Sequence, residues 1–282
     1  MASTNEIRYF LPRDSAESER LNSQHKAWMS DIGYALHPSI PTHESMRLAD
    51  VGTGTGIWFY HVAQHLSAAS QLDGFDISPS QFPDPKGTPS NITFQVQDLL
   101  QPFSDKLLGK YDVVHIRFMC FALSSVEWER AVRNLVSLLK PGGYLQWGDA
   151  AIGTLRAATT DPTQSTQYME KGIEVISQLA VATGKDFSCV ERLPLTFEEQ
   201  GLADCFQTHV ASDANPTTKS HFNVAMLLGI EAILTTIVKF GGNNVIKDNG
   251  DVREMMSHIE NELGQGAFFW YKVSVTIGRR PL

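Results

Sequence analysis

Asp50-Val-Gly-Thr-Gly-Thr-Gly56 is the stretch of sequence that decides the fold. An acidic residue and three alternating glycines stand between a short segment, Met46–Ala49, and a segment with helical spacing. Gly52 and Gly54 allow positive φ angles and lack the Cβ that would hold a ligand away from the backbone. The stretch therefore predicts a turn from a strand into a helix, with a nucleotide-containing ligand lying on bare backbone.

The spacing of the glycines distinguishes two classes of nucleotide-binding turn. A dinucleotide fingerprint, G-x-G-x-x-G, would need glycine at the position of Ile57. The observed order, acid-x-G-x-G-x-G, resembles motif I of the class I S-adenosylmethionine methyltransferases. S-adenosylmethionine carries a sulfonium cation and no pyrophosphate, so a carboxylate at the end of the strand is tolerable beside it.

Four further signals follow in the order that such a sheet requires. Asp76 ends a short apolar run, where a second parallel strand would deliver a carboxylate to the ribose hydroxyls. A third strand with alternating apolar residues ends at Asp98, where the resembling family holds the adenine amino group. Residues 110–119 predict a fourth strand. Residues 138–147 give a helix end, a Pro-Gly-Gly turn and a fifth strand, which resemble the post-motif of that family.

These signals predict an α/β protein with a Rossmann-like, doubly wound, seven-stranded sheet of the class I methyltransferase type, an N-terminal helical arm and helical insertions. Residues 1–46 are expected to form the arm or lid, and residues 47–149 the S-adenosylmethionine-binding core. Residues 150–282 would supply the insertions and the remaining strands of the same single domain.

Changes of hydrophobic period predict the remaining elements. A helix is expected in the arm from a capping box at Asp14–Glu17 to a stop at His37-Pro38. Residues 150–192, rich in Thr, Ser, Ala and Gln, predict an insertion or lid with one helix. The other expected elements are helices over 56–66, 126–139, 195–202, 218–240 and 251–263, and strands over 205–210 and 268–277.

Composition narrows the partners. The chain has 282 residues, of which 42% are hydrophobic, enough for a sizeable core. Lys and Arg number 23 against 31 Asp and Glu, giving a net charge of −8 without a basic run. A nucleic-acid partner is therefore not expected, whereas a small-molecule substrate is expected. The oligomeric state is left open.

The cysteines and the apolar segments indicate in which cellular compartment the protein is expected. Cys120, Cys189 and Cys205 are odd in number and lack C-x-x-C spacing, which favours a reducing compartment over disulfides or a zinc site. The polar N-terminus argues against a secretory signal, so a cytoplasmic location is expected. The apolar stretch Val224–Phe240 contains charges and is too short for a membrane span, so no membrane partner is expected.

The resemblance implies S-adenosylmethionine as the cofactor and a set of residues that bind it. These residues are Asp50, Gly52, Thr53, Gly54, Gly56, Asp76, Ile77, Asp98, Leu99 and Arg117. No metal is expected. Mg²⁺ would need an acidic ligand after the fourth strand, where Ile116–Met119 stands, and the pair His61 and His65 lacks a third ligand.

The N-terminal arm carries a narrower resemblance. Tyr9–His25 and His37–Pro41, taken with Asp50–Gly56 and Val114–Arg117, resemble the fungal methyltransferases of secondary-metabolite clusters. The resemblance is strongest to the members that methylate both thiols of a reduced epidithiodiketopiperazine such as gliotoxin. It implies S-methylation in two successive transfers. An N- or O-methyltransferase of another fungal metabolite and a non-catalytic, methyltransferase-like regulator remain open.

The implied reaction is an in-line displacement, for which alignment of the reactants is the main task. A thiol with a pKa near 8.5 is already a few per cent thiolate at neutral pH, so a strong base is unnecessary. Arg117 and His25 are the catalytic candidates, with a structural salt bridge and a structural histidine as their alternatives. The predicted acceptor pocket consists of Trp28, Phe118, Phe121 and Trp147, any of which could equally be core.

Overall fold

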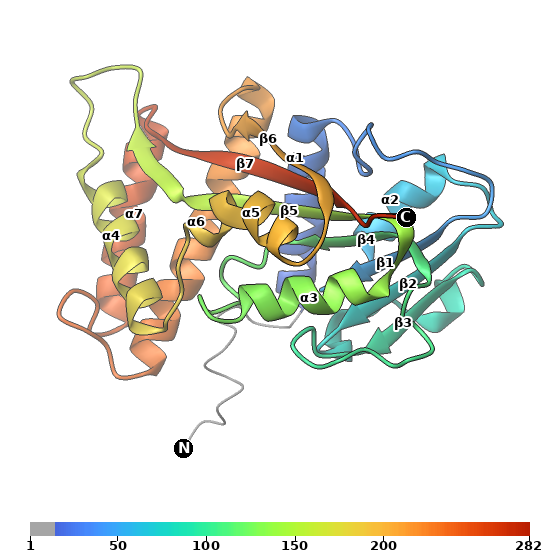
Figure 1. Cartoon of the computed structure of the whole chain (residues 1–282). Helices are drawn as coiled ribbons and strands as arrows, with labels where there is room; N and C mark the ends of the chain where they lie inside the picture. Colours follow the sequence, from blue (N-terminus) through green and yellow to red (C-terminus); the bar gives the residue numbers. More distant parts are fainter. Residues whose placement is uncertain (1–14) are drawn as a thin grey trace.

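A computed structural model describes residues 15–282 of the chain. Its centre is one seven-stranded sheet with the order β3-β2-β1-β4-β5-β7-β6 (Figure 1). Strands from β3 to β5 run parallel, whereas β7 runs antiparallel to both β5 and β6. The strands are β1 (Arg47–Val51), β2 (Gln71–Asp76), β3 (Ile92–Val96), β4 (Tyr111–Arg117), β5 (Leu139–Ala158), β6 (Ala203–Ala211) and β7 (Phe268–Arg279). The predicted seven-stranded α/β sheet is confirmed.

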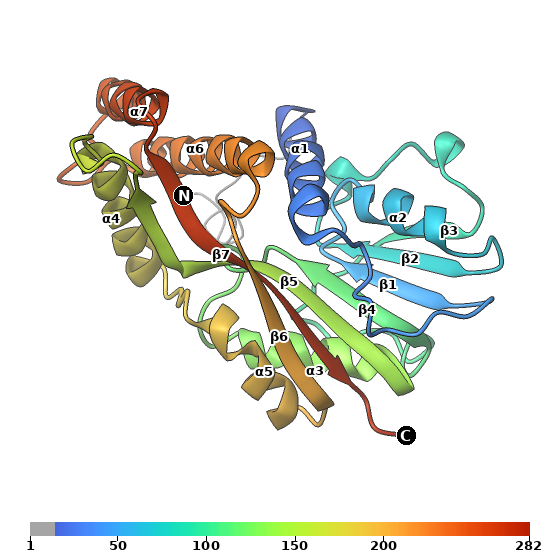
Figure 2. The ribbon, with the colours of Figure 1, turned by 90° about the horizontal axis from the view of Figure 1, so that it is seen from above.

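Helices cover both faces of the sheet, and this explains the continuous apolar character of its central strands. In β4, Tyr111–Ile116 is buried throughout. Figure 2 shows α1, α2 and α6 on one face and α3 and α5 on the other, while α4 packs against α7 at the end of the sheet. The helices are α1 (Ser15–Ile32), α2 (Ile57–Val62), α3 (Trp128–Leu138), α4 (Gln167–Ala182), α5 (Cys189–Glu199), α6 (Pro216–Lys239) and α7 (Asn249–Gly264).

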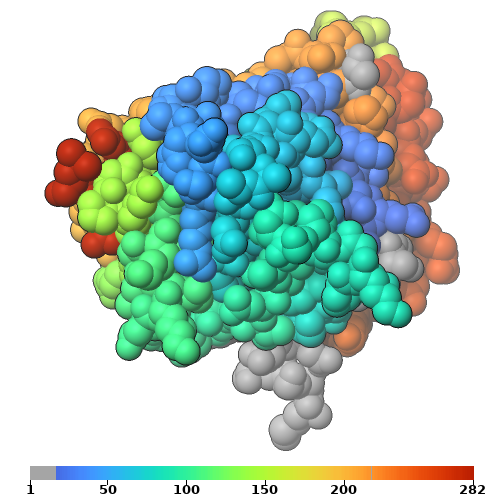
Figure 3. Space-filling view, turned by 90° about the vertical axis from the view of Figure 1, so that its right-hand side faces the viewer, coloured from blue at the N-terminus to red at the C-terminus, as the bar shows by residue number. Residues whose placement is uncertain are grey.

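The first half of the chain builds the end of the molecule that lies away from α4 and α7. Figure 3 shows this end, where segments coloured blue to green form the surface. The strands β1, β2 and β4 all end at the same edge of the sheet, because they are parallel. The carboxyl ends of such strands are where ligands bind in open α/β sheets.

The arm helix ends earlier than predicted. α1 stops at Ile32, because Gly33 adopts a φ of 82° and its N–H is bonded to the carbonyl of Met29. A glycine in the left-handed region is a common helix terminator. Of the predicted capping box, Asp14 lies outside the described residues, and the Glu17 carboxylate accepts from Arg20 instead.

The predicted insertion begins later than expected. Residues 150–158 continue β5, which pairs with β7 on both sides of an irregularity between Ala151 and Arg156. The expected helix in this region is present as α4. The predicted helix over 56–66 is shorter, since α2 ends at Val62 and continues as one 3₁₀ turn, Ala63–His65.

The length argument against a membrane span was wrong for α6. This helix begins at Pro216, so its apolar part, Thr218–Lys239, has 22 residues and a mean hydropathy of 1.6, sufficient in length and composition to cross a membrane. In the fold its inner face packs against α1, α7 and β7. About a third of the stretch is buried.

Gly56 is a packing glycine, and this leads to a stability prediction. Its φ is 70°, and a Cβ there would lie 2.6 Å from Cζ of Phe94. Gly109 has a similar φ of 66° but open space around its Cβ position. We expect Gly109→Ala to cost about 1–2 kcal/mol of strain, and Gly56→Ala to cost roughly 1–3 kcal/mol more through overpacking. Urea unfolding of both variants checks this, and equal losses would contradict it.

Candidate functional site

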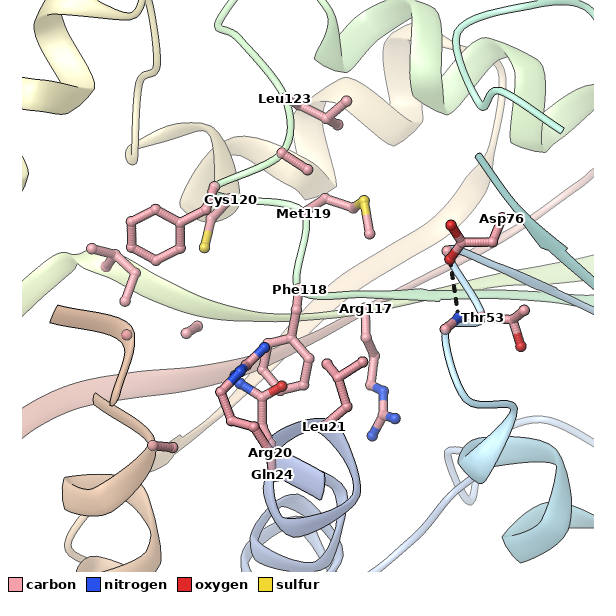
Figure 4. A pocket seen from close by; sticks show the side chains of 18 of the residues that line it. Arg20, Leu21, Gln24, Thr53, Asp76, Arg117, Phe118, Met119, Cys120 and Leu123 are labelled. Carbon is pink, nitrogen blue, oxygen red and sulfur yellow. Dashed lines mark hydrogen bonds between the residues drawn. The ribbon is translucent and has the colours of Figure 1, made fainter. Parts of the chain in front are cut away.

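A cavity of about 380 Å³ opens where the parallel strands end, between α1 and α6 (Figure 4). One half of it is polar and is formed by the glycine turn, the ends of β2 and β3, and α1. Its lining includes Arg20, Leu21, Gln24, Gly52, Thr53, Gly54, Asp76, Ile77, Asp98, Leu99 and Arg117. The other half is an apolar chamber, lined by Phe118, Met119, Cys120, Phe121, Ala150, Ile152, Ile176, Phe222, Ala225, Met226, Gly229, Ile230, Ile233, Tyr271 and Val273.

The glycine turn is pinned to the end of β2. The N–H groups of Gly52 and Thr53 both donate to the carbonyl of Phe75, at 2.7 and 3.0 Å. The N–H of Gly54 donates to Oδ2 of Asp76 at 3.0 Å (Figure 4). A Cβ on Gly52, whose φ is 70°, would lie 2.8 Å from Cε of Met119. The close approach of Met119 therefore leaves no room for a side chain at Gly52.

Four predicted cofactor residues lie at or just beyond the ends of β2 and β3. Asp76 also accepts from the N–H of Ser78, and Asp98 accepts from the N–H of Leu100, so both carboxylates are held at the cavity edge by their own turns. Ile77 is 48% exposed although it is apolar, and Leu99 is half-buried. These two apolar side chains and the Asp98 carboxylate suit an adenine ring with its amino group.

Asp50 does not face the cavity. Its Oδ1 is 2.7 Å from Nδ1 of His115, and its Oδ2 accepts from the hydroxyl of Thr53. His115 stacks flat on Trp58, with 3.9 Å between the ring centroids. The expected contact of Asp50 with the cofactor is therefore corrected: the side chain is buried and outside the cavity lining, and Asp50 supports the turn from beneath. Gly56 is likewise outside the lining, because it packs against Phe94.

Arg117 and His25 form the polar centre of the site. The Nη1 group of Arg117 donates to Nδ1 of His25 at 3.0 Å. Burial lowers the pKa of Arg117 to about 10, so it stays cationic at neutral pH. Burial and the Arg117 charge lower the pKa of His25 to about 3, which leaves a neutral imidazole that accepts. His25 lies outside the lining and positions Arg117; the expectation that it exchanges protons with the acceptor is corrected.

Asp149 is a site residue that the sequence did not reveal. It is fully buried in β5, and its carboxylate accepts from the backbone N–H groups of Met119 and Ala150 and from the indole of Trp147. Burial raises its pKa to about 6. It anchors the turn after β4, where Phe118 has an unusual φ of 58°. The sequence signal that could have identified Asp149 is an acidic residue inside an otherwise apolar strand.

The acceptor pocket differs from its prediction in two residues. Phe118 and Phe121 line the chamber, as expected. Trp28 instead packs edge-on against Phe118 from behind, and Trp147 is buried in a stack with Trp128. Both tryptophans support the wall without forming it. The residues of α6 and β7 that do form it lie more than a hundred positions further along the chain, beyond the reach of local motifs.

Within residues 15–282, no group of three His, Cys, Asp or Glu side chains is arranged to hold a metal ion. His61 and His65 lie side by side, with their ring centroids 5.9 Å apart. His61 also meets the ring of His25 edge-on. The histidines of this region therefore belong to the support of Arg117.

Comparison with known proteins identifies the class. Residues 48–143 match the family model described as a methyltransferase domain. Methyltransferase grgD of Penicillium sp is 41% identical over 149 residues, which cover 50% of this chain and 52% of that protein. N-methyltransferase tcpN of Claviceps purpurea is 39% identical over 177 residues, which cover 62% of each. The alignments thus span little more than half the length of these relatives.

Among solved structures, phosphoethanolamine N-methyltransferase 2 of Haemonchus contortus, in complex with phosphomonomethylethanolamine and S-adenosylhomocysteine, has a TM-score of 0.54 at 15% identity. The match covers 98% of this chain and 60% of that one. The chain has the class I methyltransferase fold, and S-adenosylmethionine is the cofactor of that class. Within that fold its sequence is similar to those of methyltransferase grgD and N-methyltransferase tcpN.

The neutral state of His25 predicts a pH dependence of stability. Below its ordinary pKa of 6.5 the unfolded chain protonates this residue, whereas the folded chain does so only near pH 3. Its stabilising contribution is therefore complete above pH 6.5 and is lost as the pH falls towards 3, by ~1.4 kcal/mol per pH unit. His25→Gln keeps an acceptor for Arg117 without titrating. Its unfolding free energy should fall less steeply than that of the wild type; parallel curves would refute the assignment.

Asp76 generates a prediction for cofactor affinity. Asp76→Asn keeps the shape of the side chain and removes the charge that ribose hydroxyls would meet, so S-adenosylhomocysteine binding should weaken by about 1.5–3 kcal/mol. Asp84→Asn is the matched control, because Asp84 also caps a short turn, by accepting from Lys86 N, but lies outside the cavity lining. Calorimetric titration measures both. Equal affinities in two folded variants would remove Asp76 from the cofactor site.

Proposed function

We propose that the protein is an S-adenosylmethionine-dependent methyltransferase of a small secondary metabolite, and that the acceptor atoms are the two thiols of a reduced epidithiodiketopiperazine such as dithiol gliotoxin. The observation that carries the proposal is the single cavity in which a polar half with the motif residues continues into an apolar chamber. We further propose a cytoplasmic location without nucleic-acid or membrane partners. The net charge of −8 supports the exclusion of nucleic acid.

The polar half fits the cofactor group by group. Asp76, Ile77, Asp98 and Leu99 all line this half; we assign the ribose to Asp76, and the adenine to Asp98 with the apolar side chains of Ile77 and Leu99. Arg117 is a half-buried cation whose hydrogen bond, among residues 15–282, goes to a neutral imidazole. A buried charge is stable only when it is paired and hydrogen-bonded. The carboxylate of the methionine moiety would complete the pairing of Arg117.

The apolar half suits an acceptor that needs little chemical activation. Burial raises the pKa of both Cys120 and Tyr271, so both stay protonated. Glu127, at the edge of the cavity, accepts from the backbone N–H of Ser124. A thiol supplies its own few per cent of thiolate at neutral pH, whereas an amide or a phenol would need a stronger base.

When bound, the cofactor supplies the methyl group to be transferred. The chain aligns the acceptor sulfur opposite the sulfonium: a new sulfur–carbon bond forms as the carbon–sulfonium bond breaks. The acceptor proton leaves to solvent before the transfer. Repetition at the second thiol gives the bis-thioether. Phe118 and Phe121 exclude water around the reacting atoms, which strengthens alignment and protects the cofactor.

Nitrogen is the second candidate acceptor atom. One specific observation supports it: the related protein of Claviceps purpurea is named an N-methyltransferase. The polar half of the cavity would serve either reaction equally well. The two functions differ in the nucleophile alone, so product analysis separates them.

The acceptor is tested with labelled S-adenosylmethionine and a matched panel. The panel contains a dithiol diketopiperazine, its closed disulfide, and thiol, amide, amine and phenol compounds of similar size, each with and without reductant. We expect a mono- and then a bis-methylated dithiol by mass spectrometry, and no product from the disulfide without reductant, since it offers no thiolate. Methylation of nitrogen or phenolic oxygen without any activity on the dithiol would refute the sulfur assignment.

A further inference from the structure

The wall of the apolar chamber contributed by α6 contains an unexplained glycine. Six residues of this helix line the cavity: Phe222, Ala225, Met226, Gly229, Ile230 and Ile233. At about 100° of rotation per residue they form one arc around the helix, with Phe222 and Ile233 nearest its centre and Gly229 about 30° to one side of it. One position well inside this arc thus carries no side chain.

Packing within the protein does not require a glycine there. A Cβ built on Gly229 meets no atom within 4 Å. Gly172 of α4 is the contrasting case, because its Cβ would lie 3.2 Å from Cδ1 of Ile259 in the adjacent helix. Glycine inside a helix is less favourable than alanine, so Gly229 lowers stability without any gain in packing. The missing side chain creates space in the cavity alone.

The residues around Gly229 determine which kind of chemical group this space can hold. Ala225, one turn earlier, is the other small residue of the arc, so the two leave a shallow recess between the larger Phe222 and Ile233. The opposite wall carries Tyr271 and further apolar residues of β5 and β7. The residues of α6, β5 and β7 that line the cavity include no Lys, Arg, Asp or Glu. The recess therefore suits an uncharged, apolar group.

We propose that Gly229 is a specificity-determining residue: the recess that it leaves in α6 receives the rigid, fused-ring body of the acceptor and thereby selects bulky apolar acceptors over small ones. This inference rests on the proposed methyl transfer and deepens it. It does not depend on whether sulfur or nitrogen is methylated. A residue that selects the acceptor by shape changes the affinity for the acceptor. It leaves the cofactor-binding half of the cavity unchanged.

The test compares Gly229→Ala and Gly229→Leu with Gly264→Ala. Gly264 ends α7, is exposed, has no atom within 4 Å of its Cβ position and lies outside the cavity lining. We expect Gly229→Ala to raise the Tm by about 2–3 °C through helix propensity. It should lower kcat/KM for the bulky acceptor about tenfold, and Gly229→Leu at least a hundredfold, since a methylene in an apolar pocket is worth 10–200-fold.

Three readouts keep the proposal falsifiable. S-adenosylhomocysteine affinity should stay within about twofold of the wild type in both Gly229 variants, kcat/KM should fall much more for the bulky acceptor than for a small alkanethiol, and Gly264→Ala should match the wild type throughout. A lower Tm in Gly229→Ala would show a structural glycine and overturn the inference. Unchanged kcat/KM for the bulky acceptor in Gly229→Leu would overturn it as well.

A binding experiment separates this inference from the proposed function. An apolar fluorescent dye that binds the wild-type chamber should bind much more weakly to Gly229→Leu, whether or not any acceptor is methylated. Equal dye binding by the wild type and by Gly229→Leu would overturn the proposal that this recess receives the acceptor. If Gly229→Leu loses dye binding but the wild-type protein methylates no acceptor, the proposed recess is supported and the proposed methyl transfer is refuted.

Discussion

The site depends on one buried carboxylate, that of Asp50. It joins the glycine turn to β4, because one oxygen binds Thr53 within the turn and the other binds His115 on the neighbouring strand. Its negative charge also favours the cationic form of the buried Arg117, two residues after His115. Removal of this group would leave a buried cation without compensation, which is far more costly than the loss of an ordinary hydrogen bond.

The same carboxylate explains the electrostatic layout of the cavity. Asp50 and Arg117 have opposite charges, while burial keeps His115 and His25 neutral by lowering the pKa of each. The lining of the polar half carries two cations, Arg20 and Arg117, and two carboxylates, Asp76 and Asp98, so its formal charges balance. A zwitterionic ligand with a carboxylate and a sulfonium can enter such a site without leaving a large unpaired charge behind.

Local patterns were sufficient for the first five strands along the chain and for the turn. The glycines of 52 and 54, and the acids at 76 and 98, lie in or beside the elements that place them, so short spacings predict their positions. The orientation of Asp50 could not be predicted in this way, because it depends on His115, 65 residues away. The role of α6 was hidden for another reason: a helix that is apolar nearly all round shows no sequence periodicity to mark the face that lines a cavity.

The order of the strands also governs how the molecule is assembled. β7 comes last in the sequence but lies between β5 and β6, so β6 has no place in the sheet until β7 has been synthesised. The five parallel strands and the glycine turn are complete once residue 158 has been synthesised, before β6 and β7 begin. Domains fold from the N-terminal side during synthesis, and non-local pairings form slowly. The ribosome-bound chain can therefore form the polar half of its cavity well before the apolar half exists.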